Sequence, residues 1–116
     1  MVHRGAELDR SWVCPGAEVA GRVVGSIVGP GVRVERGAEV RHSVLMADAV
    51  VRSGASVRRA VLAEHVDVGR GATVGAANAR RPVLVGARRR IAPRAHLSAG
   101  SELEPTRARD LFRSAR

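Results

Sequence analysis

The chain has 116 residues, of which 45% are apolar and 27% are charged, so it has room for one domain and is not a disordered tail. A single cysteine excludes an internal disulfide framework, and no apolar run approaches the roughly 20 residues of a membrane span. The formal net charge is +9, but only 2% of residues are aromatic, so the base-stacking surfaces of many nucleic-acid-binding proteins are missing. We therefore expect a cytoplasmic protein that binds neither membranes nor nucleic acids.

The positive charge is concentrated in the last third of the chain, and every basic residue other than histidine is an arginine. Residues 1–79 hold 10 arginines and 8 acidic residues, a balance of +2. Residues 80–116 hold 10 arginines and 3 acidic residues, a balance of +7. The exclusive use of arginine can result from a biased base composition of the gene or from a function of the arginines. Both interpretations stay open.

An internal repeat of 17 residues organises the sequence. Residues 34–40 (VERGAEV), 51–57 (VRSGASV) and 68–74 (VGRGATV) resemble one another, and pieces such as SIV, SVL and AVL lie between the repeats. Each repeat divides into pieces of 6, 5 and 6 residues, and each piece opens with an aliphatic residue. The openers form three rows: Val2, Val19, Val34, Val51, Val68 and Val85; Leu8, Val23, Val40, Val57, Val74 and Ile91; and Val13, Val28, Leu45, Leu62, Ala79 and Leu97.

Aliphatic residues at this spacing fit neither an amphipathic helix nor a series of hairpins. They predict a triangular coil in which each piece forms one side, and each coil stacks on the next at about 4.8 Å. This is an all-β fold, the left-handed parallel β-helix of hexapeptide repeats, with about six coils over residues 1–104. Residues 105–116 form a C-terminal tail, for which we expect a short helix that caps the prism with Leu111 and Phe112.

The fifth residue of each piece is mostly small or aliphatic, and we expect it to point inward beside the opener. Examples are Ala6, Ala17, Ile27, Val32, Ala38, Val44, Ala49 and Val61. Trp12 stands at the same position near the start, where the end of the prism tolerates bulk. Asn78 and Arg89 also stand there, and an arginine cannot be buried without a partner. The coil that contains residues 78–82 is therefore predicted to open into a loop.

Four histidines are candidates for the catalytic base that acyltransferases with this fold use. His3, His42, His65 and His96 fall at different positions of their pieces, all outward or at corners, so we do not expect them to converge. Cys14 is a surface thiol with no fixed base nearby, and the glycines recur at coil corners rather than in a phosphate-binding loop. We expect no catalytic, cofactor-binding or metal-binding residue, with a hexapeptide-repeat acyltransferase subunit as the alternative.

A stack of like charges is the strongest candidate site. Arg41 and Arg58 share an outward position in successive repeats, and His42 and Arg59 follow them directly. With no acid opposite, these four residues predict an anion or effector patch for phosphate or carboxylate, and a solvated surface is the alternative. A second cluster would serve the same end or dock another subunit: Arg80, Arg81, Arg88, Arg89, Arg90 and Arg94.

Residues 11–21 (SWVCPGAEVAG), 23–34 (VVGSIVGPGVRV) and 43–45 (SVL) resemble the C-terminal domain of ADP-glucose pyrophosphorylase (glucose-1-phosphate adenylyltransferase). The resemblance implies a left-handed β-helix that follows a nucleotidyltransferase domain in an enzyme that makes the glucosyl donor for glycogen. The catalytic half of that family, with its glycine-rich nucleotide loop, is missing from this sequence, so no catalytic residue is carried over. What the resemblance implies is a role in subunit assembly and in regulation by metabolites.

The first coil begins without a covering segment, because residues 2–8 already match the repeat at residues 34–40. An exposed coil edge and an open apolar end template aggregation, and natural solenoids cover them. We therefore expect another copy of the chain, or a nucleotidyltransferase catalytic domain, to cover this end. An anionic metabolite is the expected effector.

Overall fold

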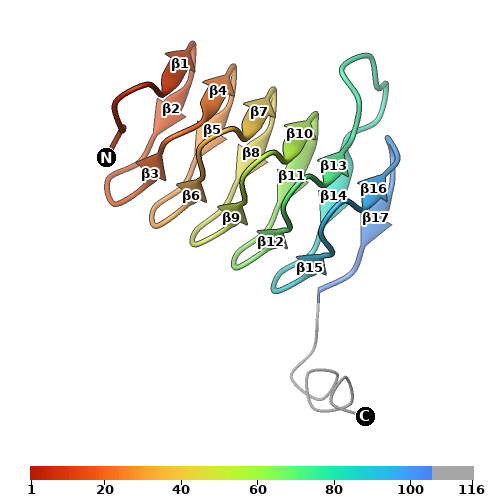
Figure 1. Ribbon diagram of the computed structural model, residues 1–116. Helices are drawn as coiled ribbons and strands as arrows, with labels where there is room; N and C mark the ends of the chain where they lie inside the picture. The colour runs from red at the N-terminus through yellow and green to blue at the C-terminus, as the bar shows by residue number, and fades with distance from the viewer. Residues whose placement is uncertain (106–116) are drawn as a thin grey trace.

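The structure is a computed structural model that describes residues 1–105. It confirms an all-β, left-handed parallel β-helix in which about six triangular coils stack along one axis (Figure 1). Residues 1–105 contain 17 short strands and no helix. The helix predicted for residues 105–116 falls, apart from Pro105, outside the described residues.

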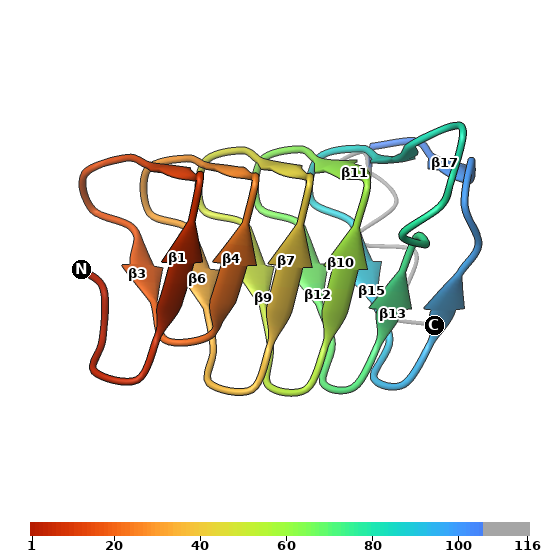
Figure 2. The same cartoon turned by 90° about the horizontal axis from the view of Figure 1, so that it is seen from above.

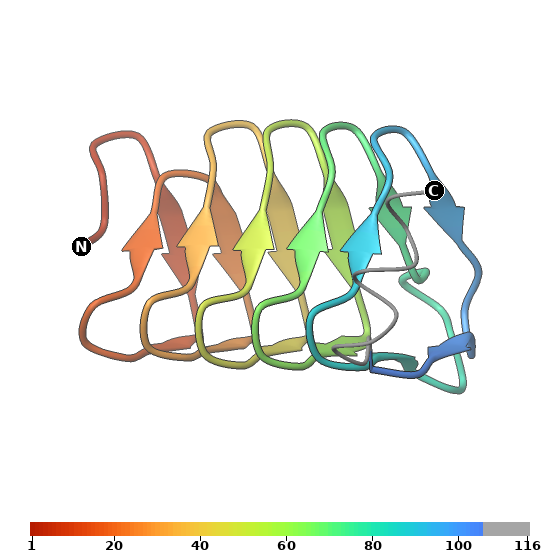
Figure 3. The same ribbon diagram turned by 90° about the horizontal axis from the view of Figure 1, so that it is seen from below.

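The strands form three parallel sheets, one for each side of the prism. Sheet A contains β3 (Glu18–Val19), β6 (Arg33–Val34), β9 (Val50–Val51), β12 (Asp67–Val68) and β15 (Arg90–Ile91). Sheet B contains β1 (Glu7–Asp9), β4 (Arg22–Val24), β7 (Glu39–Arg41), β10 (Ser56–Arg58), β13 (Thr73–Val74) and β16 (His96–Leu97). Sheet C contains β2 (Trp12–Val13), β5 (Ile27–Val28), β8 (Val44–Leu45), β11 (Ala60–Leu62), β14 (Val83–Val85) and β17 (Glu102–Leu103). Figure 2 shows the stack with sheet B in front, and Figure 3 shows it with sheet A in front.

The core is a stack of openers. In sheet B, Val40 pairs in register with Val23 on one side and with Val57 on the other. All three of these valines are fully buried. Because each coil places the same position above the same position, aliphatic side chains fill the narrow interior without any aromatic ring.

The prediction that the fifth residue points inward is confirmed for the six-residue pieces and is wrong for the five-residue piece. In a six-residue piece, a two-residue turn precedes the buried fifth residue, as at Ala38. The five-residue piece has one turn residue fewer, so its fourth residue is buried and its fifth points outward on sheet C. Trp12 is accordingly 71% exposed and Ile27 51% exposed. Val44 and Val61, at the same position of later coils, are half-buried on the outer side.

The predicted loop is present between β13 and β14, where residues 75–82 form no strand and project from the stack (Figure 1). Arg89 is not buried: it is partly exposed, and its Nε donates to the carbonyl oxygen of Glu104 at 2.6 Å. The loop lengthens this repeat from 17 to 23 residues, because Leu62 pairs with Val85 and Val68 pairs with Ile91.

The predicted rows therefore place the last openers on the wrong side of the prism. Val85 belongs to sheet C rather than sheet A, Ile91 to sheet A rather than sheet B, and Leu97 to sheet B rather than sheet C. Ala79 lies in the loop instead of opening a strand. A repeat count that assumes a constant period cannot detect six additional residues in one corner.

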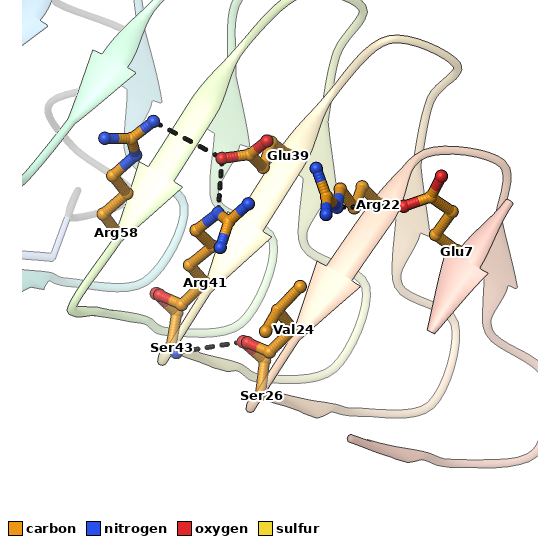
Figure 4. A network of polar contacts seen from close by, with 8 residues as sticks. All are labelled: Glu7, Arg22, Val24, Ser26, Glu39, Arg41, Ser43 and Arg58. Atoms are coloured by element: carbon orange, nitrogen blue, oxygen red, sulfur yellow. Dashed lines mark hydrogen bonds and ion pairs between the residues drawn. The ribbon is translucent and has the colours of Figure 1, made fainter. Parts of the chain in front are cut away.

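A ladder of serine hydroxyl groups stabilises the corner between sheets B and C. The Oγ of Ser43 donates to the carbonyl oxygen of Arg41 at 2.8 Å and accepts from the amide of Ala60 in the next coil at 3.1 Å. The Oγ of Ser26 accepts in the same way from the amide of Ser43 at 3.1 Å (Figure 4). Both serines are almost fully buried, so each hydroxyl satisfies an amide that water cannot reach.

Candidate functional site

The outer side of sheet C is apolar over five coils. Its strands pair in register so that one outward row runs along the solenoid axis: Trp12, Ile27, Val44, Val61 and Leu84. No charged residue stands in this row before Glu102 in β17. Sequence reasoning missed the row, because it placed the fifth residue of the short pieces in the core.

The other two sheets have charged outer sides. Outward residues of sheet B pair across coils as Glu7, Arg22 and Glu39, and those of sheet A as Glu18 and Arg33 or as Asp67 and Arg90. An exposed apolar row several coils long on an otherwise charged molecule is typical of an interaction surface. Sheet C is therefore the first candidate site.

The predicted arginine patch lies on sheet B, and the expectation that no acid faces it is wrong. Arg41 and Arg58 are register neighbours on β7 and β10. The Oε1 of Glu39 accepts from the Nε of Arg41 at 2.6 Å and from the Nη2 of Arg58 at 3.4 Å (Figure 4). The repeat pattern did not pair Glu39 with the arginines, because Glu39 stands two residues before Arg41 on the same outward side of the strand. Each arginine of the predicted stack therefore already has a carboxylate partner.

His42 and Arg59 lie at the next corner, on adjacent coils. Both adopt the left-handed backbone region with φ of +48°, and Gly25 takes the equivalent place with φ of +57°. The ring of His42 occupies the space beside Gly25, where an added Cβ would approach its Nδ1 to 2.7 Å. The Nε of Arg59 donates to the carbonyl oxygen of Ala77 at 2.7 Å, which ties the projecting loop to this corner.

The hydrogen bond from Arg41, together with the charges of Arg41, Arg58 and Arg22, lowers the pKa of Glu39 below its ordinary value of 4.5, although burial opposes this shift. Because the pKa is lower in the folded state, the ion pairs stabilise the fold above pH 4.5, and that stability is lost as the pH falls through the folded pKa. We predict that Glu39→Gln is less stable than the wild type by no more than about 1 kcal/mol at neutral pH. Thermal melts should show the difference shrinking below pH 4.5, and a difference that grows on acidification would contradict this reading.

A groove of about 420 Å³ lies beside β12 and β15 of sheet A. Its lining includes Arg90, a member of the second arginine cluster. Arg52, Arg70 and Arg90 line it together with Asp67. Arg52 holds Asp67 through two hydrogen bonds, from Nε at 3.0 Å and from Nη2 at 2.8 Å, and this pairing raises the pKa of Arg52. An ion pair within the chain therefore forms part of the lining of the groove, and Arg70 and Arg90 add two further guanidinium groups.

Residues 2–82 match the family model described as GlmU-like, C-terminal hexapeptide. The chain belongs to this GlmU-like hexapeptide family. The comparison with curated proteins finds no match. The family model covers the coils in which the regular repeat is clearest, and its match ends at Pro82, where the projecting loop rejoins the stack.

The histidines of this family member are distributed over different coils and sides. The Nε2 of His3 lies 3.7 Å from Glu18, the Nε2 of His65 lies 3.7 Å from Asp48, and His96 is on sheet B. Within residues 1–105, no three histidine, cysteine or acidic side chains gather as metal ligands. Cys14 is half-buried at the outer side of sheet C, directly after β2. No helix that could cross a membrane occurs in the described part of the chain.

Proposed function

We propose that the chain is a non-catalytic assembly and regulatory β-helix of a sugar-phosphate nucleotidyltransferase of the glucose-1-phosphate adenylyltransferase type, which supplies the glucosyl donor for glycogen in the cytoplasm. The observation that carries the assembly role is the uncharged apolar row on the outer side of sheet C. The resemblance of residues 11–21 and 23–34 supports the choice of enzyme, and membership of a C-terminal hexapeptide family supports a role beside a catalytic domain.

The chain alone is predicted to catalyse neither adenylyl transfer to glucose 1-phosphate nor acyl transfer from acetyl-CoA. Mixed with the catalytic domain of a nucleotidyltransferase of this type, it should form a complex whose mass is measurable by size-exclusion chromatography with light scattering. Failure to bind any such domain would leave the nucleotidyltransferase part of the proposal without support.

A hexapeptide-repeat acyltransferase subunit is the second candidate function. The observation that favours it is the exposed pair of His65 and Asp48, in which the Oδ2 of Asp48 lies 3.7 Å from the Nε2 of the imidazole, within reach of an ion pair with a protonated ring. Acyl transfer that is abolished by His65→Ala or His42→Ala would promote this candidate over the first.

We also propose that Arg41, His42, Arg58 and Arg59 bind an anionic metabolite, in competition with Glu39. The Nε of Arg58 is buried and has no hydrogen-bond acceptor among the described residues, so an anion that reaches this cluster would satisfy it. A sugar phosphate such as glucose 1-phosphate should raise the melting temperature, less so at high salt, and more in Glu39→Gln than in the wild type. An unchanged response in the Arg41→Ala/Arg58→Ala double variant would identify the cluster as plain solvated surface.

A further inference from the structure

The corner between sheets A and B is two residues short in the second coil. A regular corner has four residues, as at residues 35–38, but only Ala20 and Gly21 lie between β3 and β4. The strands on both sides of the short corner keep their register, since β3 pairs with β6 and β4 pairs with β7. Figure 3 shows this corner cut short between two corners of full length. A gap, which we call the corner slot, therefore separates the turn at residues 4–5 from the turn at residues 36–37.

The corner slot has the height of one polypeptide chain. Its two sides are hollows of about 290 and 260 Å³, and Ala20 and Arg36 line both of them. In the regular corners, an added Cβ at Gly37 or Gly54 would lie 3.6 or 3.7 Å from the amide nitrogen of the turn glycine in the next coil. An added Cβ at Gly5 would meet nothing within 4 Å. Since neighbouring coils lie about 4.8 Å apart, the slot has room for one extended chain.

Gly21 makes the short corner possible and fixes the floor of the slot. It is buried, and an added Cβ would lie 2.5 Å from the carbonyl oxygen of Ala38 and 2.7 Å from that of Glu35. The amide of Arg22 donates to the carbonyl oxygen of Ala38 at 2.9 Å, and the carbonyl oxygen of Gly21 accepts from the amide of Glu7 at 3.2 Å. The floor is therefore held by the coils on both sides, and a bound segment would meet a preformed surface.

Each wall of the corner slot presents a main-chain group that the regular corners pair. There, the third residue of a turn donates its amide to the second turn residue of the preceding coil, as Arg94 does to Arg70 at 2.8 Å. Gly37 is a third turn residue, and Arg4 is the second turn residue of the first coil. Within residues 1–105, the amide of Gly37 has no acceptor and the carbonyl oxygen of Arg4 has no donor. A peptide segment can pair with both, because amide and carbonyl groups alternate along its backbone.

The charge that remains unpaired at the corner slot is positive. The carboxylates that line it already contact basic side chains, in the pairs Glu7–Arg22, Glu18–His3, Glu35–Arg52 and Glu39–Arg41. Arg36 lines both hollows, and neither Arg36 nor Arg4 has a carboxylate partner in the described part of the chain. Both are exposed and hold the same place in their turns, one on each side of the slot. A carboxylate between the two turns would therefore meet positive charge from both.

We propose that the corner slot binds a short acidic peptide segment of a partner protein, which takes the place of the missing turn. A carbonyl oxygen of the segment accepts from the amide of Gly37, and an amide of the segment donates to the carbonyl oxygen of Arg4. A side-chain carboxylate of the segment pairs with Arg36 and Arg4. A small anion would occupy one hollow, whereas a chain extends through both. The inference goes beyond the proposed function, because it requires neither a nucleotidyltransferase nor an acyl acceptor.

The first test titrates the full chain with two blocked tetrapeptides, Ala-Asp-Gly-Ala and Ala-Arg-Gly-Ala, and follows backbone amides by nuclear magnetic resonance. We expect the acidic peptide to bind at least about tenfold more tightly than the basic one. The amide of Gly37 should shift downfield as it gains an acceptor, and the amide of Gly54 in the next corner should not shift. Equal affinities, or no shift of Gly37 at about 10 mM acidic peptide, would overturn the proposal.

Inorganic phosphate is the control for simple anion binding. It should compete with the acidic peptide only weakly, because it pairs with the arginines but does not continue the backbone hydrogen bonds across the slot. Phosphate that shifts the amide of Gly37 as far as the peptide does, and displaces the peptide at equal concentration, would identify an anion site without peptide recognition. That result would overturn the proposal.

The second test compares Arg36→Glu with Arg70→Glu. Both arginines are exposed second residues of their turns, and both substitutions change the net charge equally, but Arg70 lies in the fifth coil, away from the slot. Arg36→Glu should bind the acidic peptide about tenfold more weakly than the wild type, and Arg70→Glu should bind it like the wild type. Equal affinities of the two variants would mean that the peptide responds to net charge and not to the slot.

The third test fills the slot from within the chain. Insertion of Arg-Gly between Ala20 and Gly21 gives the second coil a corner of regular length, so its own backbone occupies the space of the peptide. This variant should keep the β signal in circular dichroism and lose binding of the acidic peptide. An insertion variant that folds and binds the peptide like the wild type would overturn the proposal. If the insertion prevents folding, the comparison of Arg36→Glu with Arg70→Glu decides.

Discussion

Val57→Asp is expected to unfold the β-helix. Val57 is fully buried and stacked between Val40 and Val74, so a carboxylate there meets aliphatic side chains above and below and no cation within the core. Burying an unpaired charge in this position should reduce the free energy of unfolding by about 5 kcal/mol or more. That loss matches the whole stability of many domains of this size. Circular dichroism should show loss of the β signal, and Val40→Asp should behave in the same way.

Val50→Asp is the matched control for this prediction. Val50 is also in a short strand, β9, but it points outward between Arg33 and Asp67, so the new carboxylate remains solvated with a cation on one side. We expect Val50→Asp to keep a cooperative melt close to that of the wild type. Equal melting temperatures for Val57→Asp and the wild type would mean that the assignment of inward and outward positions is wrong.

Ser43→Ala is expected to reduce the free energy of unfolding by about 2 kcal/mol. The Oγ of Ser43 is the acceptor for the amide of Ala60, and the serine is only 3% exposed. Without this hydroxyl group, the amide of Ala60 stays buried but has no acceptor. This costs more free energy than the loss of a hydrogen bond that water can replace. Chemical denaturation monitored by circular dichroism measures the effect directly.

Ser56→Ala provides the control for the serine ladder. Ser56 lies on the outer side of β10, between Glu39 and Thr73 of the neighbouring coils, where water can solvate the hydroxyl. Its replacement should change the free energy of unfolding by less than about 0.5 kcal/mol. Equal losses in Ser43→Ala and Ser56→Ala would indicate that the hydroxyl of Ser43 does not support the amide of Ala60.

The fold was predictable because the aliphatic openers report the period of the coil directly. Val23, Val40 and Val57 stack in the predicted register, and all are buried. What the period could not report is a change in corner length. The loop at residues 75–82 adds six residues to one repeat, so Val85 and Ile91 move to different sides of the prism.

The candidate site was harder to predict, because it depends on which side of a two-residue strand each residue occupies. One residue fewer in the short piece turns Ile27 and Val44 outward, although both are as apolar as core residues. Apolar character alone therefore cannot separate core from interface. In the arginine patch the repeat correctly predicted that Arg41 and Arg58 are neighbours. It did not reveal Glu39, whose contacts with them depend on side-chain direction along the strand.

The mass of the full chain in solution, measured by light scattering over a wide range of concentrations, tests the assembly role most directly. We predict a mass well above that of a single 12.2 kDa chain at high concentration, with dissociation on dilution. A mass of one chain at every concentration, both alone and in the presence of a nucleotidyltransferase catalytic domain, would contradict an assembly role for this β-helix.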